Sequence, residues 1–150
     1  MLDLFAELRR VVEALDAAGV PYALVGGLAV SIYATPRATE DIDLLIAPDD
    51  LPKATAALQE IGFRAAGRPM RVAAGRLEIQ RLTRIEGADL LPLDLLTPLD
   101  PELARAVSDR TTPAIEGRRL SVIGLAGLRA LKRLRGSTLD RADLEALGDE

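Results

Sequence analysis

Two aspartates, Asp41 and Asp43, flank a single isoleucine in an apolar segment that runs to Ile46. If residues 41–46 form a β-strand, side chains two positions apart project from the same face. Two carboxylates that project together in apolar surroundings are costly unless a cation lies between them. Because Mg²⁺ prefers oxygen ligands of this kind, the spacing predicts a metal site.

A glycine pair, Gly26-Gly27, lies between a strand expected at residues 22–25 and a helix expected at residues 28–34. Backbone N–H groups at the start of a helix favour phosphate. Taken alone, the glycines are typical of any tight turn, and the aspartates of a solvent-facing edge strand. In this order, strand, glycine pair, helix and acidic strand together indicate nucleotide chemistry.

A third carboxylate, Asp94, interrupts a leucine-rich run at residues 90–96 that has the pattern of a buried strand. An ionised aspartate there needs a partner or a raised pKa. The alternative is an edge strand whose aspartate reaches water, which Pro92 supports because proline favours sheet edges. Beside Asp41 and Asp43, we interpret Asp94 as a third ligand of one cation site and as a candidate base for an attacking hydroxyl.

The composition limits the chemistry further. The chain has 150 residues, of which 49% are hydrophobic and 28% charged, and we expect one globular domain over residues 1–150. No segment suits a membrane span and the first residues lack a signal-peptide pattern, so we expect a cytoplasmic protein without membrane contacts. Cysteine and histidine are absent, which excludes disulfides, thiolate zinc sites and Ser-His-Asp triads.

The net charge of −4 is not typical of an independent nucleic-acid-binding protein. Six arginines nevertheless fall within a short segment opposed only by Glu78: Arg64, Arg68, Arg71, Arg76, Arg81 and Arg84. They are interpreted either as a patch for an anionic acceptor or as a solvated edge of the protein.

Hydrophobic periodicity and turn residues predict a mixed order of helices and strands. Helices are expected at residues 4–15, 28–34, 50–60 (capped by Asp49 or Asp50), 101–107, 125–135 and 138–147. Strands are expected at residues 22–25, 41–46, 77–85, 90–96 and 120–123, the third and fourth joined as a hairpin. This order predicts an α+β (α/β) fold with a small mixed β-sheet flanked by helices.

The stretch from Val25 to Ala29, followed by Asp41-Ile42-Asp43-Leu44, resembles the nucleotidyltransferase superfamily. Within it, the chain is most similar to the minimal nucleotidyltransferases grouped with AbiEii-type toxins. The segments Leu128-x-x-Leu131-Lys132 and Asp140-x-x-Asp143-Leu144 are similar to the tail of that group. In this chain Leu28 follows the glycine pair, so no serine is present there and phosphate contacts must come from backbone N–H groups. The chain is also too short for the large helical region of the full toxins.

The resemblance implies a polymerase β-like fold and assigns roles to particular residues. The metal-binding and catalytic residues would be Asp41, Asp43 and Asp94, holding Mg²⁺ (two ions, with Mn²⁺ as a substitute). The nucleotide-binding residues would be Gly26, Gly27, Arg37, Thr39 and Lys132. For Arg37 and Thr39, which flank the acidic strand, the alternative is that they are loop residues without a ligand.

Three residues of the tail, Lys132, Asp140 and Asp143, also have structural interpretations. For Lys132 the alternative is a surface lysine whose stem covers neighbouring leucines. The sequence Ser137-x-x-Asp140 predicts a helix cap, and Asp140 and Asp143 are interpreted as structural support.

The activity implied is Mg²⁺-dependent transfer of a nucleoside monophosphate from an NTP to an acceptor hydroxyl, with release of pyrophosphate. The resemblance implies an RNA acceptor such as tRNA and an antitoxin as a protein partner. One alternative is nucleotidylation of a small hydroxylated antibiotic, which the acidic composition favours because aminoglycosides are cationic. Another is a non-catalytic nucleotide-binding module that regulates a partner chain.

Overall fold

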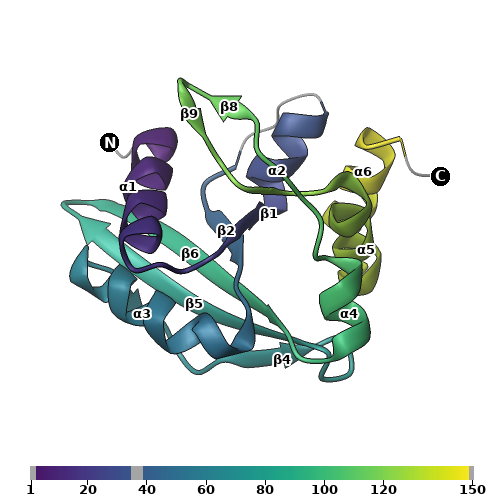
Figure 1. Ribbon diagram of the computed structural model, residues 1–150, viewed down its shortest axis with the longest axis horizontal. Helices are drawn as coiled ribbons and strands as arrows, with labels where there is room; N and C mark the ends of the chain where they lie inside the picture. Colours follow the sequence, from purple (N-terminus) through teal and green to yellow (C-terminus); the bar gives the residue numbers. More distant parts are fainter. Residues whose placement is uncertain (1–2, 35–38, 149–150) are drawn as a thin grey trace.

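The computed structural model describes residues 3–34 and 39–148. Its main sheet has eight strands. Figure 1 labels β1, β2, β4, β5 and β6 of this sheet, together with the helices around it. The strand order is β3 (Arg64–Ala65), β5 (Leu77–Glu86), β6 (Asp89–Pro98), β2 (Ile42–Leu45), β1 (Ala23–Val25), β10 (Val122–Ile123) and β7 (Arg110–Thr111), with β4 (Met70–Val72) also paired to β5. A separate hairpin consists of β8 (Ala114–Ile115) and β9 (Arg118–Arg119).

Six α-helices accompany these strands in the described ranges. They are α1 (Leu4–Ala17), α2 (Gly26–Tyr33), α3 (Leu51–Glu60), α4 (Pro101–Ala106), α5 (Leu125–Arg135) and α6 (Thr138–Ala146), and a 3₁₀ turn, η1 (Pro48–Asp50), precedes α3. Helices α1 and α3 contact each other on the left of Figure 1, and α4, α5 and α6 lie on the right. The predicted mixed sheet flanked by helices is confirmed. None of the helices in these ranges is long and apolar enough to cross a membrane.

The sheet is mixed because its central strands form both parallel and antiparallel pairs. Strand β2 runs parallel to β6 and antiparallel to β1, and β1 runs parallel to β10. Strands β5 and β6 form a long antiparallel hairpin whose pairs run from Leu77↔Pro98 to Glu86↔Asp89. This continuous ladder fixes the register of β6, and therefore the position of Asp94 within the sheet.

The core lies between the sheet and its helices. Helix α1 buries one stripe of apolar side chains, which are Leu8, Val11, Val12 and Leu15. All four residues of β2 are buried, so this strand is covered on both faces. Arg84 of β5 forms a buried ion pair with Glu7 of α1, which joins that helix to the hairpin.

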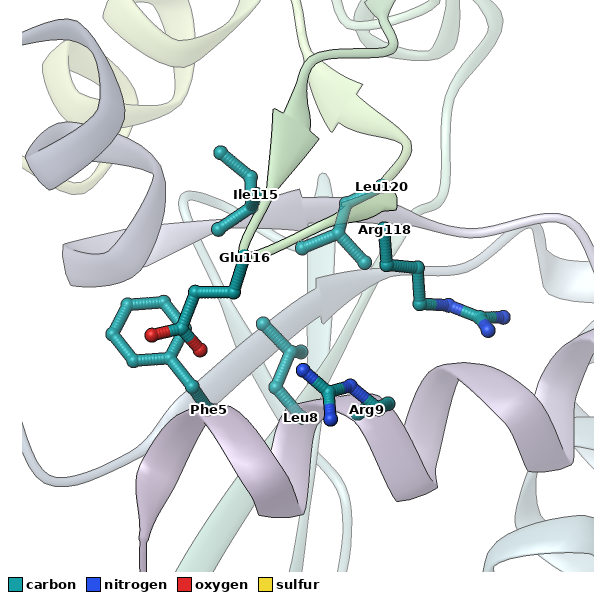
Figure 2. Close-up of a pocket in the computed structure, with 7 residues that line it drawn as sticks. All are labelled: Phe5, Leu8, Arg9, Ile115, Glu116, Arg118 and Leu120. Atoms are coloured by element: carbon teal, nitrogen blue, oxygen red, sulfur yellow. The ribbon is translucent and has the colours of Figure 1, made fainter.

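Helix α1 also packs against the β8–β9 hairpin. A small cavity of about 10 Å³ lies between them, lined by Phe5, Leu8, Arg9, Ile115, Glu116, Arg118 and Leu120 (Figure 2). Arg118 donates a hydrogen bond to Asp16 at 2.9 Å across the same junction. This cavity has room for about one water molecule, so it is a packing feature and not a ligand site.

Several sequence-based expectations need correction. Helix α2 begins at Gly26, two residues before the predicted start. Asp50 is the N-cap residue of α3, as predicted, but it ends the 3₁₀ turn η1 and its side chain makes no capping hydrogen bond. The strands β3, β4, β7, β8 and β9 were not predicted, because two or three residues carry too little periodicity to detect. The edge-strand alternative for Asp94 is wrong, since β6 lies between β5 and β2.

Candidate active site

The strand register brings the three predicted carboxylates together. Asp43 of β2 lies directly opposite Asp94 of β6, and Asp41 immediately precedes β2. One oxygen from each of the three carboxylates lies within 4.8 Å of the other two. Oxygens bound to a single Mg²⁺ are at most about 4.2 Å apart, so a small contraction would place all three on one cation.

The glycine pair is packed against this cluster. At Gly26, φ is +69°, and an added Cβ would lie 2.1 Å from Oδ2 of Asp43. Only glycine permits this approach, because any side chain there would occupy the space of the carboxylate. Gly26 therefore allows the Asp43 carboxylate to lie against the start of α2.

The protonation of Asp43 reflects its surroundings. The pKa of Asp43 is raised to about 7, chiefly by burial and then by the negative charges of Asp41 and Asp94, while Arg135 and Lys132 act in the opposite direction. A buried carboxyl with two carboxylate neighbours is costly to ionise without a cation. The all-oxygen donor set, the space created by Gly26 and this electrostatic cost together fit a divalent metal ion.

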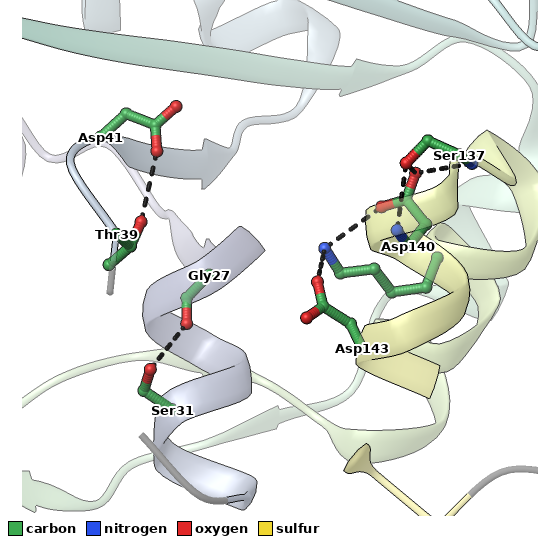
Figure 3. A network of polar contacts seen from close by, with 8 residues as sticks. Gly27, Ser31, Thr39, Asp41, Ser137, Asp140 and Asp143 are labelled. Atoms are coloured by element: carbon green, nitrogen blue, oxygen red, sulfur yellow. Dashed lines mark hydrogen bonds and ion pairs between the residues drawn. The ribbon is translucent and has the colours of Figure 1, made fainter. Parts of the chain in front are cut away.

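Two neighbours hold the other carboxylates in place. Arg81 of β5 is the cross-strand partner of Asp94 and donates two hydrogen bonds to it, Nε to Oδ1 at 2.8 Å and Nη2 to Oδ2 at 3.0 Å. The same guanidinium lies 3.7 Å from Oδ2 of Asp41. The hydrogen bond to Asp94 is the largest of the effects that raise the pKa of Arg81. Thr39 donates a hydrogen bond to Oδ1 of Asp41 at 3.3 Å, as Figure 3 shows.

Lys132 is buried and paired, so the alternative interpretation of it as a surface lysine is wrong. Its Nζ lies 3.3 Å from Oδ1 of Asp140 and 2.9 Å from Oδ2 of Asp143, both on α6 (Figure 3). The predicted cap is confirmed, because Ser137 and Asp140 form a reciprocal capping box at the start of α6. Lys132 thus joins the end of α5 to α6 through an ion-pair network.

One open cavity of about 200 Å³ contains the predicted site residues that the structure describes. It is lined by Gly26, Gly27, Thr39, Asp41, Asp43, Arg81, Asp94, Lys132, Arg135, Ser137, Leu139 and Asp140. The predicted nucleotide contact Arg37 lies outside the described residues. The glycine pair, the three carboxylates, Thr39 and Lys132 therefore border the same space.

The first turn of α2 lines this cavity through Gly26 and Gly27. The residue before Gly26 is Val25, and no side chain caps the helix start. The N–H groups of an uncapped first turn attract phosphate oxygens. Lys132 and Arg135 add positive charge on the same cavity wall. This arrangement suits an anionic ligand whose charge reaches from the helix start towards the carboxylates.

Sequence reasoning missed Arg81, Arg135 and Leu139 as site residues. Arg81 was visible only as one member of the arginine cluster, and the register of the β5–β6 hairpin was needed to place it on Asp94. The other members of that cluster do not form one free patch. Arg71 pairs with Glu78, Arg76 with Asp100, and Arg84 with Glu7 and Glu86.

Comparison with known proteins agrees with this geometry. Residues 2–133 match the model of a family described as uncharacterised nucleotidyltransferase. A search of curated proteins finds no match.

Three solved structures share the fold. The chain is 17% identical to ANT(2″)-Ia in complex with adenylyl-2″-tobramycin, with a TM-score of 0.64 over 95% of this chain and 84% of that one. It is 18% identical to the lincosamide antibiotic adenylyltransferase LnuA with lincomycin bound, with a TM-score of 0.63 over 95% of each chain. It is 14% identical to a proposed nucleotidyltransferase from Thermotoga maritima, with a TM-score of 0.66 over 95% of this chain and 90% of that one.

These similarities confirm the nucleotidyltransferase fold that the resemblance implied. The family match spans most of the chain and includes the glycine pair and all three carboxylates. The protein is a member of this family of uncharacterised nucleotidyltransferases.

Proposed function

We propose that the chain transfers a nucleoside monophosphate from an NTP to an acceptor hydroxyl, with Asp41, Asp43 and Asp94 holding Mg²⁺. The observation that carries this proposal is the convergence of three carboxylates beside a glycine whose missing side chain makes room for one of them. Two ions or Mn²⁺ would suit the same oxygen donors.

Other residues that line the cavity bind the triphosphate or orient a metal ligand. The N–H groups of Gly26 and Gly27 hold the triphosphate, and Lys132 and Arg135 compensate its charge from the end of α5. Thr39 orients Asp41 through its hydrogen bond. Bound Mg²⁺ would supply charge neutralisation at the phosphates and orientation of the reacting oxygens.

The transfer step needs a proton acceptor near the attacking hydroxyl. In this step, the oxygen of the acceptor hydroxyl forms a bond to the α-phosphorus of the NTP. The bond between that phosphorus and the pyrophosphate oxygen breaks, and the hydroxyl loses its proton. Asp94 is the proposed base, because it borders both this cavity and the neighbouring one. Arg81 holds both of its oxygens and fixes its direction.

For the acceptor, two candidates come from the sequence and the comparisons. An RNA acceptor such as tRNA, with an antitoxin partner, follows from the AbiEii-type resemblance. A small hydroxylated antibiotic is favoured by the shared fold with ANT(2″)-Ia and LnuA, whose structures contain adenylyl-2″-tobramycin and lincomycin.

Incubation with each α-³²P-labelled NTP and Mg²⁺ tests the proposal. The acceptor arms are total tRNA, tobramycin and lincomycin, and D43N is the inactive control. Label transfer that requires Mg²⁺ and is lost in D43N supports the proposed nucleotidyltransferase activity. NTP binding by the wild type without transfer to any acceptor would instead support a regulatory nucleotide-binding module.

A further inference from the structure

A second cavity of about 460 Å³ adjoins the carboxylate cluster. It is lined by Ala66, Gly67, Arg68, Met70, Ile79, Arg81, Asp94 and Arg135. It shares Arg81, Asp94 and Arg135 with the nucleotide cavity, but Gly26 and Gly27 do not line it. A molecule in the second cavity can therefore reach Asp94 without occupying the space at the start of α2.

The charge of this cavity is opposite to that of the whole chain. Three guanidinium groups line it, and its one carboxylate, Asp94, already accepts two hydrogen bonds from Arg81. The chain as a whole has a net charge of −4. Positive walls repel a polycation and attract phosphate, which guanidinium groups bind in a bidentate manner.

The cavity also has an apolar wall. Met70 of β4 and Ile79 of β5 are cross-strand partners, and Met70 is 60% exposed. Arg68 precedes β4 and is exposed, and it lines this cavity without lining the nucleotide cavity. One cationic side chain is thus available to a second ligand while the nucleotide site is filled.

We propose that this second cavity binds the acceptor, and that the acceptor is an organic phosphate with a free hydroxyl, whose phosphate contacts Arg68. The inference rests on the proposed function and deepens it. The hydroxyl lies at Asp94, loses its proton there and attacks the α-phosphorus, and pyrophosphate leaves on the side of α2. Met70 and Ile79 cover the carbon skeleton of the acceptor.

Calorimetric binding with Mg²⁺ and no NTP tests this proposal directly. The probes are ribose 5-phosphate, ribose and tobramycin. We expect ribose 5-phosphate to bind at least tenfold more tightly than ribose or tobramycin. R68E should lose at least tenfold of that affinity. R105E is the control, because Arg105 is exposed on α4 and lines neither cavity, and it should stay within twofold of wild type.

A ten-nucleotide RNA with a free 3′ hydroxyl identifies the source of the phosphate. If the RNA binds more tightly than ribose 5-phosphate and R68E weakens its binding, the acceptor is a nucleic acid. If ribose 5-phosphate binds more tightly than the RNA, the acceptor is a small sugar phosphate. Equal binding of ribose and ribose 5-phosphate, preference for tobramycin, or identical behaviour of R68E and R105E would overturn the proposal.

Failure of the proposed function has a separate signature. R68E should keep the Mg²⁺-dependent thermal stabilisation by NTP, because Arg68 lies outside the nucleotide cavity. If wild-type protein shows no such stabilisation, the nucleotide site is refuted. The effect of R68E on ribose 5-phosphate affinity still tests whether the second cavity binds an organic phosphate.

Discussion

The Asp43 carboxylate lies in the space that a side chain on Gly26 would fill, with Oδ2 2.1 Å from the position of the missing Cβ. The end of β1 and the start of α2 therefore pack against the Asp43 carboxylate of the neighbouring strand β2. Gly26 therefore has a steric role in addition to the phosphate contact proposed for its N–H group.

Gly26→Ala should both destabilise the protein and remove metal binding. The methyl group would displace a buried carboxylate and would also require a non-glycine residue at φ +69°. Gly19→Ala is the matched control, because Gly19 has φ +70° and no atom within 4 Å of an added Cβ. We expect G26A to lower the melting temperature clearly more than G19A, and only G26A to lose stabilisation by Mg²⁺. Equal losses in both would show that backbone conformation alone accounts for the effect.

Asp43→Asn should stabilise the metal-free protein above neutral pH. The pKa of Asp43 is raised to about 7 in the folded state, so between pH 4 and 7 the folded chain binds more protons than the unfolded one. This contribution to stability is present at low pH and is lost as pH rises through 7. At pH 8, D43N should gain on the order of 1 kcal/mol or more in the free energy of unfolding, measured by urea denaturation in EDTA. A loss of stability in D43N at pH 8 would contradict the electrostatic account.

Mg²⁺ affinity should depend on pH through the same group. Below pH 7 a metal ion must displace a proton from Asp43, so the apparent affinity should fall about tenfold for each pH unit. Calorimetry in two buffers of different ionisation enthalpy measures the released proton. Absence of proton release at pH 6 would mean that Asp43 is already ionised there in the metal-free protein.

Arg81→Met should lower stability without metal and increase the stabilisation that Mg²⁺ provides. Its guanidinium is within ion-pair distance of both Asp94 and Asp41, so its removal leaves three carboxylates without this counter-charge. Arg71→Met serves as the control, because exposed Arg71 of β4 lies 3.3 Å from Glu78 of β5, and this ion pair should contribute about 1 kcal/mol or less. Melting temperatures with EDTA and with Mg²⁺ measure both effects. A smaller Mg²⁺ shift in R81M than in wild type would count against Arg81 as the counter-ion of the empty site.

Lys132→Met should be costly for folding, by about 3 kcal/mol or more, because it leaves Asp140 and Asp143 buried without their cation. Lys53, the only other lysine in the chain, is exposed on α3, and K53M should change stability by no more than about 0.5 kcal/mol. The triple variant K132M/D140N/D143N should recover much of the lost stability. NTP affinity in the triple variant then isolates the nucleotide role of Lys132: wild-type affinity would assign the lysine to structure alone.

Much of the site could be predicted from sequence because its residues break local patterns. Asp43 and Asp94 are charged residues inside apolar runs, and the Gly26-Gly27 pair opens a helix. Each is visible within a window of a few residues. The long elements were predictable for the same reason, and α5 was predicted with the bounds it has.

What could not be predicted depends on register and on distant partners. The bond from Arg81 to Asp94 requires that two ten-residue strands align in one particular register. Lys132 shows no local sign of burial, because its two acidic partners lie on the next helix. Half of the residues that line the second cavity come from β4 and from the segment that connects it to β3, which are too short to leave a periodic signal.

The parallel pairing of β2 with β6 has a consequence for the order of folding. Strand β2 ends at Leu45 and β6 begins at Asp89, so α3 and the strands β3, β4 and β5 lie within the loop that closes when Asp43 and Asp94 meet. Closing so long a loop is slow compared with forming the local β5–β6 hairpin, which places Arg81 on Asp94 early. We therefore expect Arg81 to be paired with Asp94 before Asp41 and Asp43 reach it, so that a positive charge is present as the three carboxylates come together.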